Sequence, residues 1–358
     1  MGQRLARSNF SSRGGCSEDI RLLPLKSRKS SSEPEEEKVV IVGLRNSGKS
    51  TLFKQARLLY STGLTLDDKK CFKKDIIRHI IRATQDIVTT FSSEGDQGKQ
   101  FLTLTLDALR SIGVVDASTV SNLNADIASS ITTIWQDQHF RSLYEKSPYF
   151  CEGLEGNATQ CKNFPRWGGE DWIPTNDDIL RCNIRTSGVH ECRFTVDGLP
   201  FKFIDFDGIA MRRAVARKMI QSVSNVVFVA ALSDYDETLP DAPDRNALLD
   251  ALKIFKALLE GQKEKCNAID NPILVLNKAD KFHEKLCKRK VPLNVSGEFP
   301  DAPRTFDFSA GIDWIRQEFL KQVDLETCDL QIYVVNALDM EDVRVTFDQV
   351  IGSLSYAV

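Results

Sequence analysis

The chain has 358 residues, of which 42% are hydrophobic and 27% charged, the composition of an ordinary globular protein. At about 150 residues per domain, this length predicts two domains or three, with enough chain for a sizeable core. The net charge is −3, from 47 basic and 50 acidic side chains, which excludes a protein that holds a nucleic-acid polymer by bulk positive charge. The longest apolar run, residues 226–232, is far shorter than the about 20 residues that cross a bilayer.

Residues 1–38 are expected to be a flexible tail, because serine, arginine, glycine and proline dominate and little can be buried. Seven basic and two acidic side chains lie in the first 29 residues. Two interpretations stay open: a solvated tail, or a segment attracted to the anionic inner face of the plasma membrane. Met1-Gly2 begins like a myristoylation signal although Ala6 stands where Ser or Thr is preferred, and Cys16 is a candidate for palmitoylation.

The cysteines give an expectation about the compartment. Nine are scattered along the chain without CxxC spacing, and four histidines do not supply the missing ligands of a zinc cluster. Cysteines in this arrangement favour reduced thiols, and therefore a cytoplasmic protein.

Strand and helix patterns alternate after residue 38. Residues 38–43 form a β-branched run that ends in glycine, typical of a buried strand, and a helix is expected over residues 49–60. Strands are then expected again at 192–196, 201–205, 225–231, 272–277 and 330–335, with helices over 245–259 and 312–322. The first two of these strands are separated by Asp197-Gly198 and predict a hairpin. Strands that alternate with helices predict a mostly parallel α/β sheet.

Between these parts, residues 64–177 lose the strand pattern. Apolar residues recur there at helical spacing, near 76–88, 101–112, 120–137 and 139–145. Trp135 and Trp172 are interpreted as residues that pack in the core or at the seam between domains, rather than as ligand platforms. We therefore expect a helical domain, residues 63–177, inserted into an α/β domain made of residues 39–62 and 178–358.

The turn after the first strand carries a phosphate-binding motif. Residues 43–50, GLRNSGKS, fit the pattern GxxxxGK[ST] between a predicted strand and a predicted helix. In such a loop the backbone amides surround phosphate oxygens, the helix N-terminus adds its dipole, the lysine adds a charge and the serine hydroxyl can bind Mg²⁺. The residues expected to contact the nucleotide are Gly43, Arg45, Asn46, Ser47, Gly48, Lys49, Ser50 and Thr51.

Two later motifs indicate which nucleotide binds. Residues 277–280, NKAD, end a predicted strand, and the carboxylate of Asp280 can accept hydrogen bonds from N1 and the 2-amino group of guanine, a donor pair that adenine lacks. Asn277 and Lys278 belong to the same motif. Residues 205–208, DFDG, follow another strand, so that Asp205 can hold Mg²⁺ through water and the Gly208 amide can sense the γ-phosphate. These motifs disfavour a P-loop kinase or ATPase.

With these motifs the chain resembles the α subunits of heterotrimeric G proteins over residues 38–350. Residues 178–188, DILRCNIRTSG, resemble the family's first switch, and residues 230–236, AALSDYD, resemble the segment after its fourth strand. The resemblance implies a Ras-like P-loop GTPase domain, with a mostly parallel sheet flanked by helices, and an inserted all-helical domain. It also implies that GTP or GDP binds with Mg²⁺. The residues implied are Ser50 and Thr186 as metal ligands, Leu180 and Arg181 near the nucleotide, and Ala337 against guanine.

The chain departs from the family at its catalytic positions. The family's arginine that stabilises transition-state charge is Asn183 here, and its water-orienting glutamine is Ile209, which can neither donate nor accept a hydrogen bond. The family's phosphate-loop glutamate is Asn46. With Lys49 retained, these departures predict normal binding of GTP and Mg²⁺ with slow hydrolysis. The neighbouring Arg181 and Arg185 are the candidates to replace the missing arginine.

The segments that correspond to the family's partner-binding surfaces also differ in this chain. Residues 211–216, MRRAVA, correspond to the family's second switch but lack the tryptophan that docks the βγ dimer. The tail stands in place of a long N-terminal helix, and the last helix, from about Glu341, ends short of the family's receptor-binding end. An effector is thus expected, whereas coupling to βγ and to a membrane receptor is disfavoured. Two functions remain open: a GTP-dependent switch of the α-subunit type, or a hydrolysis-deficient, GTP-loaded adaptor that acts as a binding module.

Overall fold

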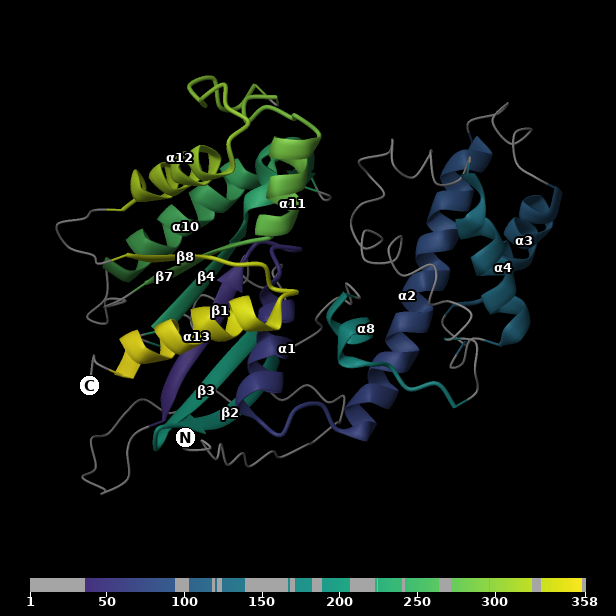
Figure 1. Cartoon of the computed structure of the whole chain (residues 1–358), viewed down its shortest axis with the longest axis horizontal. Helices are drawn as coiled ribbons and strands as arrows, with labels where there is room; N and C mark the ends of the chain where they lie inside the picture. Colours follow the sequence, from purple (N-terminus) through teal and green to yellow (C-terminus); the bar gives the residue numbers. More distant parts are fainter. Residues whose placement is uncertain are drawn as a thin grey trace.

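The structure, a computed structural model, describes residues 36–93, 103–117, 120, 124–138, 167, 171–181, 189–206, 223, 225–239, 242–263, 272–295, 297–323 and 330–355. Its central element is a six-stranded sheet in the order β2-β3-β1-β4-β7-β8 (Figure 1). The strands are β1 (Glu37–Gly43), β2 (Val189–Val196), β3 (Leu199–Phe206), β4 (Asn225–Ala231), β7 (Ile273–Asn277) and β8 (Gln331–Val334).

The sheet is mostly parallel, as the sequence predicts. β1 pairs in parallel with β3 and β4, and β7 pairs in parallel with β4 and β8. β2 and β3 are antiparallel and form the predicted hairpin. Its turn residues Asp197 (φ 51°) and Gly198 (φ 86°) both have the left-handed conformation that two-residue hairpin turns require.

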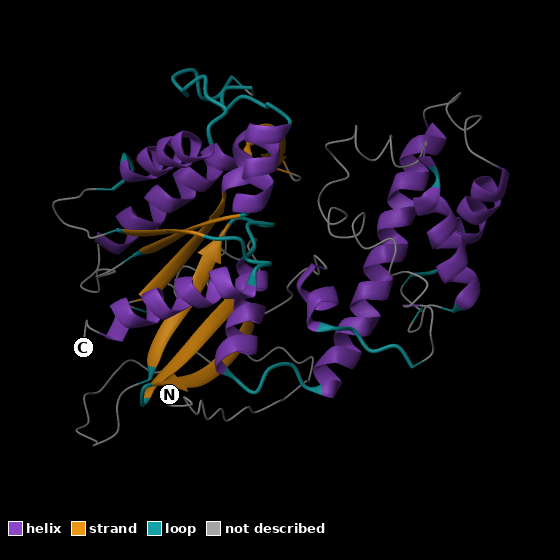
Figure 2. Cartoon of the chain, viewed as in Figure 1, coloured by secondary structure: helices purple, strands orange, loops and turns teal. Residues whose placement is uncertain are grey.

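Alternating side chains of the strands build two cores on opposite faces of the sheet. On β1, Val40 and Val42 point into one core and Val39 and Ile41 into the other, and all four are fully buried. Both faces of the strand are apolar because both are covered by helices, as in other parallel sheets. Helices α10 and α12 cover one face, and α1 and α13 cover the other (Figures 1 and 2).

The covering helices and their connections have the following bounds: α1 (Lys49–Tyr60), α10 (Ala247–Lys263), α11 (Ala279–His283), α12 (Phe308–Leu320) and α13 (Met340–Ser355), with the 3₁₀ helix η5 (Leu232–Asp236) and the π-helical turn η6 (Glu284–Lys288). The helix predicted from residue 245 begins at Ala247 instead. The preceding residues form β6 (Ala242–Asn246), which pairs with β5 (Thr238–Leu239). Asn246 then caps the helix, because its side-chain oxygen accepts a hydrogen bond from the Leu249 amide at 2.9 Å.

The described residues between α1 and α8 (Asn176–Arg181) are largely helical. They form α2 (Leu66–Ser93), α3 (Thr103–Gly113) and α4 (Ala125–Gln136). Buried isoleucines of α2 and α4 form an apolar cluster separate from the two cores at the sheet. Trp135 and Trp172 lie in this cluster, as the sequence predicts, and Trp172 stacks on Trp167 with ring centroids 5.3 Å apart. The tail before residue 36 and the helix expected at 139–145 lie outside the described residues.

Candidate functional site

The phosphate-binding motif forms the connection from β1 to α1. All the residues that the sequence predicts to contact the nucleotide phosphates lie in this connection or in the first turn of α1: Gly43, Arg45, Asn46, Ser47, Gly48, Lys49, Ser50 and Thr51. Asn46 has φ 62° and Gly48 has φ 99°, so the chain alternates in handedness and forms the type of concave turn in which successive amides can face one anion. The Lys49 ammonium is buried and donates to the Leu44 carbonyl oxygen at 2.5 Å. A buried lysine beside a ring of amides at a helix N-terminus is suited to bind phosphate.

The two glycines of the motif are required by close packing as well as by backbone conformation. A Cβ atom on Gly43 would lie 2.1 Å from the backbone carbonyl oxygen of Val229 on β4. A Cβ atom on Gly48 would lie 1.9 Å from Nδ2 of Asn277 at the end of β7. Because such contacts are far below van der Waals distance, the loop can approach these two strands only with glycine at both positions.

Asn277 connects the phosphate loop to the loop after β8. Its Nδ2 donates to the Ser47 carbonyl oxygen at 2.8 Å, and its Oδ1 accepts a hydrogen bond from the Ala337 amide at 3.0 Å. The side chain is buried, so both bonds form away from water. Gln55 of α1, also buried, donates to the Ala337 carbonyl oxygen at 3.0 Å. The phosphate loop and the loop after β8 are therefore held together through side chains.

The residues expected to bind guanine lie around this connection. Lys278 has φ 59° and precedes α11, which places Asp280 in the exposed first turn of that helix. The Ala279 amide donates to the Val335 carbonyl oxygen at 3.4 Å, so the NKAD segment also contacts the loop that contains Ala337. The sequence motifs identified Asn277 but not Gln55, a polar residue among mostly apolar side chains on the buried face of α1.

Ser50 and Asp205 form the expected metal end of the site. Asp205 is 1% exposed, and its carboxylate accepts a hydrogen bond from the Ser50 hydroxyl. Burial raises the pKa of Asp205, and the nearby Lys49 ammonium partly offsets that rise. Its Oδ1 is buried and has no hydrogen-bond partner within the described chain. An unsatisfied buried carboxylate oxygen next to a serine hydroxyl fits the oxygen ligands that Mg²⁺ prefers, directly or through water.

Helix α8 brings the start of the first-switch segment to α1. Lys54 of α1 donates to the Ile179 carbonyl oxygen at 3.3 Å, and Leu180 is buried. The Nε of Arg181 lies 2.8 Å and 2.9 Å from the two carboxylate oxygens of Asp177. Arg181, one of the two candidates to replace the family's arginine, is thus engaged in an ion pair on its own helix. Asn183, Arg185, Thr186, Gly208 and Ile209 lie outside the described residues.

A partly buried cluster of charged residues follows β4, and the only hint of it in the sequence is the triplet Asp234-Tyr235-Asp236. Lys285 of η6 donates to Asp236 at 2.7 Å, to the Ser233 carbonyl oxygen at 3.1 Å and to Glu237. Asp234 lies with Asp236 on the 3₁₀ helix η5 and is 8% exposed. Burial raises the pKa of Asp234 to about 6, against the opposing attraction of Lys278, the lysine of the NKAD motif.

Asp234→Asn is expected to stabilise the protein at neutral pH. A carboxyl whose pKa is raised on folding binds its proton more tightly in the native state, so its contribution to the free energy of unfolding falls as pH rises from about 4 to 6. With the pKa raised to about 6, the wild type should be about 3 kcal/mol less stable than the variant at pH 7.5. Denaturant unfolding of both proteins with saturating GDP at pH 4.5 and 7.5 measures this difference. A variant that is less stable at pH 7.5 would contradict it.

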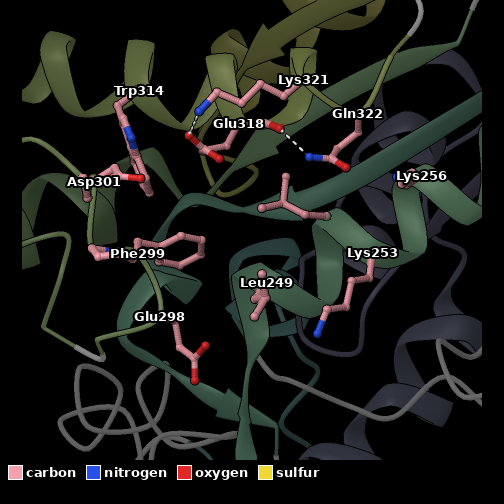
Figure 3. Close-up of a pocket in the computed structure, with 13 residues that line it drawn as sticks. Leu249, Lys253, Lys256, Glu298, Phe299, Asp301, Trp314, Glu318, Lys321 and Gln322 are labelled. Carbon is pink, nitrogen blue, oxygen red and sulfur yellow. Dashed lines mark hydrogen bonds and ion pairs between the residues drawn. The ribbon is translucent and has the colours of Figure 1, made fainter.

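A pocket lies away from the phosphate loop. It has a volume of about 380 Å³ and is bounded by α10, α12 and the loop at residues 298–302 (Figure 3). Phe299 and Trp314 meet edge to face, with ring centroids 5.2 Å apart, and form its apolar wall. Lys253 stands on the α10 side (Figure 3). None of the phosphate-loop residues lines this pocket.

Within the described residues, no helix is long and apolar enough to span a bilayer.

Comparisons with known proteins agree with the geometry of the site. A family model described as G-protein alpha subunit matches residues 20–354. The guanine nucleotide-binding protein alpha-9 subunit of Dictyostelium discoideum is 28% identical over 319 residues, covering 89% of each chain. The alpha-2 subunit of that organism is 28% identical over 352 residues, covering 93% of this chain and 91% of its own. A guanine nucleotide-binding protein subunit alpha of Colletotrichum trifolii is 26% identical over 315 residues, covering 86% of this chain and 84% of its own.

The family match extends over nearly the whole sequence, and it includes the phosphate loop, the NKAD segment and both loops that Asn277 joins. Members of the family bind guanine nucleotides and are in general GTPases. At 25–28% identity to its relatives, the sequence is a divergent one. The chain belongs to the G-protein alpha subunit family.

Proposed function

We propose that this chain is a signalling switch that binds GTP in its active state and hydrolyses it slowly. The observation that carries the proposal is the double contact of Asn277, which joins the phosphate loop at Ser47 to the loop at Ala337. Because one buried side chain holds both loops, the phosphate cradle and the base site act as one pocket. In that pocket Asp280 selects guanine, since adenine would leave its carboxylate without donors.

We further propose that Mg²⁺ binds with the nucleotide, through Ser50 and Thr186, with Asp205 holding it through water. The hydrogen bond of Ser50 to the buried Asp205 and the unsatisfied oxygen of Asp205 support this assignment. A bound Mg²⁺ neutralises charge on the phosphates. The segments around Thr186 and Gly208 would be ordered by the γ-phosphate and released when it is lost.

Slow hydrolysis follows from the side chains at two positions. Asn183 cannot supply the positive charge of an arginine, and Ile209 cannot orient a water molecule. Arg181, one of the two candidates to replace the family's arginine, is paired with Asp177 on its own helix. The chain would therefore remain in its GTP-bound state longer than other members of the family.

The proposed organisation is a tail at residues 1–38, a GTPase domain at 39–62 and 178–358, and a helical domain at 63–177. The separate apolar cluster of α2, α3 and α4 supports the last of these. We place the protein in the cytoplasm, with the basic tail in contact with the inner face of the plasma membrane. An effector is the proposed partner of the GTP-bound state, and the altered second switch disfavours the βγ dimer and a receptor.

Limited proteolysis tests the switch. With Mg²⁺ present, the GDP-bound protein should be cut by trypsin after Arg212 or Arg213, and a non-hydrolysable GTP analogue should protect these sites, because the γ-phosphate orders the segment that follows Gly208. Cleavage sites are identified by mass spectrometry. The control is Arg289, an exposed residue just after η6 that pairs with Glu284, at which cleavage should be equal in the two states.

The alternative function, a GTP-loaded adaptor, is favoured by the same two residues, Asn183 and Ile209. An adaptor that does not switch would give one proteolysis pattern with both nucleotides. Chromatography of the nucleotide released from purified protein would then find mainly GTP. Identical patterns would contradict the switch and favour the adaptor.

A further inference from the structure

The phosphate loop carries a second cationic side chain besides Lys49. Arg45 is two residues after Gly43, and the motif, GLRNSGKS, contains no acidic residue. Lys49 Nζ lies 2.5 Å from the Leu44 carbonyl oxygen, so the phosphate-binding ammonium group touches the peptide bond that joins Leu44 to Arg45. Arg45 is half-buried. The base of this arginine therefore lies at the position where a nucleotide's phosphates meet the lysine.

The direction of the loop shows which phosphate is nearest. Asn277 contacts Ser47 on one side and Ala337 on the other, which places Ser47 toward the base. Leu44 and Arg45 precede Ser47 in the loop, and the Leu44 carbonyl oxygen lies 2.5 Å from the buried Lys49 ammonium. A nucleotide laid along the loop with its base near Ala337 would present its outer phosphates to Arg45.

We propose that Arg45 is a specificity-determining residue: its guanidinium contacts the terminal phosphate of bound GTP and sets the preference of this protein for the triphosphate over the diphosphate. The inference rests on the proposed function, and it deepens it. GTP carries a γ-phosphate with further negative charge and acceptor oxygens that GDP lacks. An arginine offers that phosphate a planar pair of donors with full charge, which a backbone amide does not.

The preference would complement slow hydrolysis. A switch that rarely cleaves GTP is kept in the active state only if GDP does not displace the triphosphate. A cation that contacts the γ-phosphate raises affinity for GTP alone, and therefore biases the protein toward that state. Lys49 cannot produce the same bias by itself, because it also reaches the β-phosphate that both nucleotides share.

The test compares two ligands in three variants. Calorimetry with Mg²⁺ measures the dissociation constants of GDP and of a non-hydrolysable GTP analogue for the wild type, Arg45→Ala and Arg45→Gln. The matched control is Arg289→Ala, which removes an exposed arginine that is paired with Glu284 and is not part of the phosphate loop. Loss of one charged contact should weaken the analogue about ten- to a hundredfold in both Arg45 variants, with GDP changed less than about threefold. Arg289→Ala should leave both constants unchanged.

Arg45→Gln keeps much of the side-chain length without the charge, so it provides the test if Arg45→Ala does not fold. Equal weakening of both nucleotides, or an unchanged ratio of the two constants, would overturn the role of Arg45 while leaving guanine-nucleotide binding intact. Failure of the wild type to bind either guanine nucleotide is a different result, and would overturn the proposed function itself.

Discussion

Replacing Asn183 by arginine together with Ile209 by glutamine is expected to accelerate single-turnover GTP hydrolysis by about 10³-fold or more. G-protein alpha subunits are themselves among the systems from which the known range for arginine fingers, about 10³–10⁵, is drawn. The physical reason is that the transition state spreads negative charge over the phosphoryl oxygens, and the wild type offers no arginine at position 183 to stabilise it. The glutamine restores a group that can both donate to and accept from the attacking water.

The control for this prediction is Asn183→Lys with Ile209→Gln. Lysine supplies a charge without the planar pair of donors, so its acceleration should be smaller than that of arginine. Each single variant is measured as well, because residues that act together on one transition state are not additive. Rapid-quench measurement of phosphate release from preloaded protein gives the rates. A wild-type rate already equal to that of other family members, or no gain in the double variant, would contradict the account of Asn183 and Ile209.

Gly48→Ala should abolish tight nucleotide binding, with a loss of at least about a hundredfold in GDP affinity. Two effects act together. The backbone at residue 48 has φ 99°, a conformation that strains any side chain by about 1–3 kcal/mol. The added Cβ would also lie 1.9 Å from Asn277 Nδ2, so the side chain that joins the two loops must move. The displaced loop would no longer direct its backbone amides toward one phosphate group.

Gly352→Ala is the matched control. Gly352 lies within α13, and no atom lies within 4 Å of a Cβ built there. This substitution should raise the free energy of unfolding by about 0.5–1 kcal/mol and leave GDP affinity unchanged. Fluorescence titration and denaturant unfolding of both variants separate binding from folding. If Gly48→Ala binds GDP within about threefold of wild type, the packing of the loop against Asn277 does not determine the affinity.

Much of this fold can be predicted from the sequence because local patterns and final packing agree. The strand before Gly43 is apolar on both faces, as a strand covered by helices on both sides must be, and α1 has the predicted bounds, 49–60. The hairpin follows from Asp197-Gly198, which favour the left-handed turn. The phosphate loop and the NKAD segment were identified because their chemistry depends on residues close together in the chain.

What the sequence did not predict depends on distant contacts. The two hydrogen-bond partners of Asn277 lie 230 and 60 residues away along the chain, and the hydrogen-bond partner of Gln55 lies 282 residues away. No local pattern encodes such pairs. The helix predicted from residue 245 begins later because Asn246 pairs in β6 and caps α10. Lys285 and its carboxylate partners Asp236 and Glu237 likewise lie 49 and 48 residues apart along the chain.

We propose that one pocket, assembled from the phosphate loop and the NKAD segment through Asn277, selects guanosine triphosphate. Calorimetric titration of the nucleotide-free protein with GTP and with ATP, both in the presence of Mg²⁺, tests it most directly. GTP should bind at least about a thousandfold more tightly than ATP, because ATP leaves the Asp280 carboxylate without its donor pair. Equal affinity for the two, or binding of neither, would contradict it.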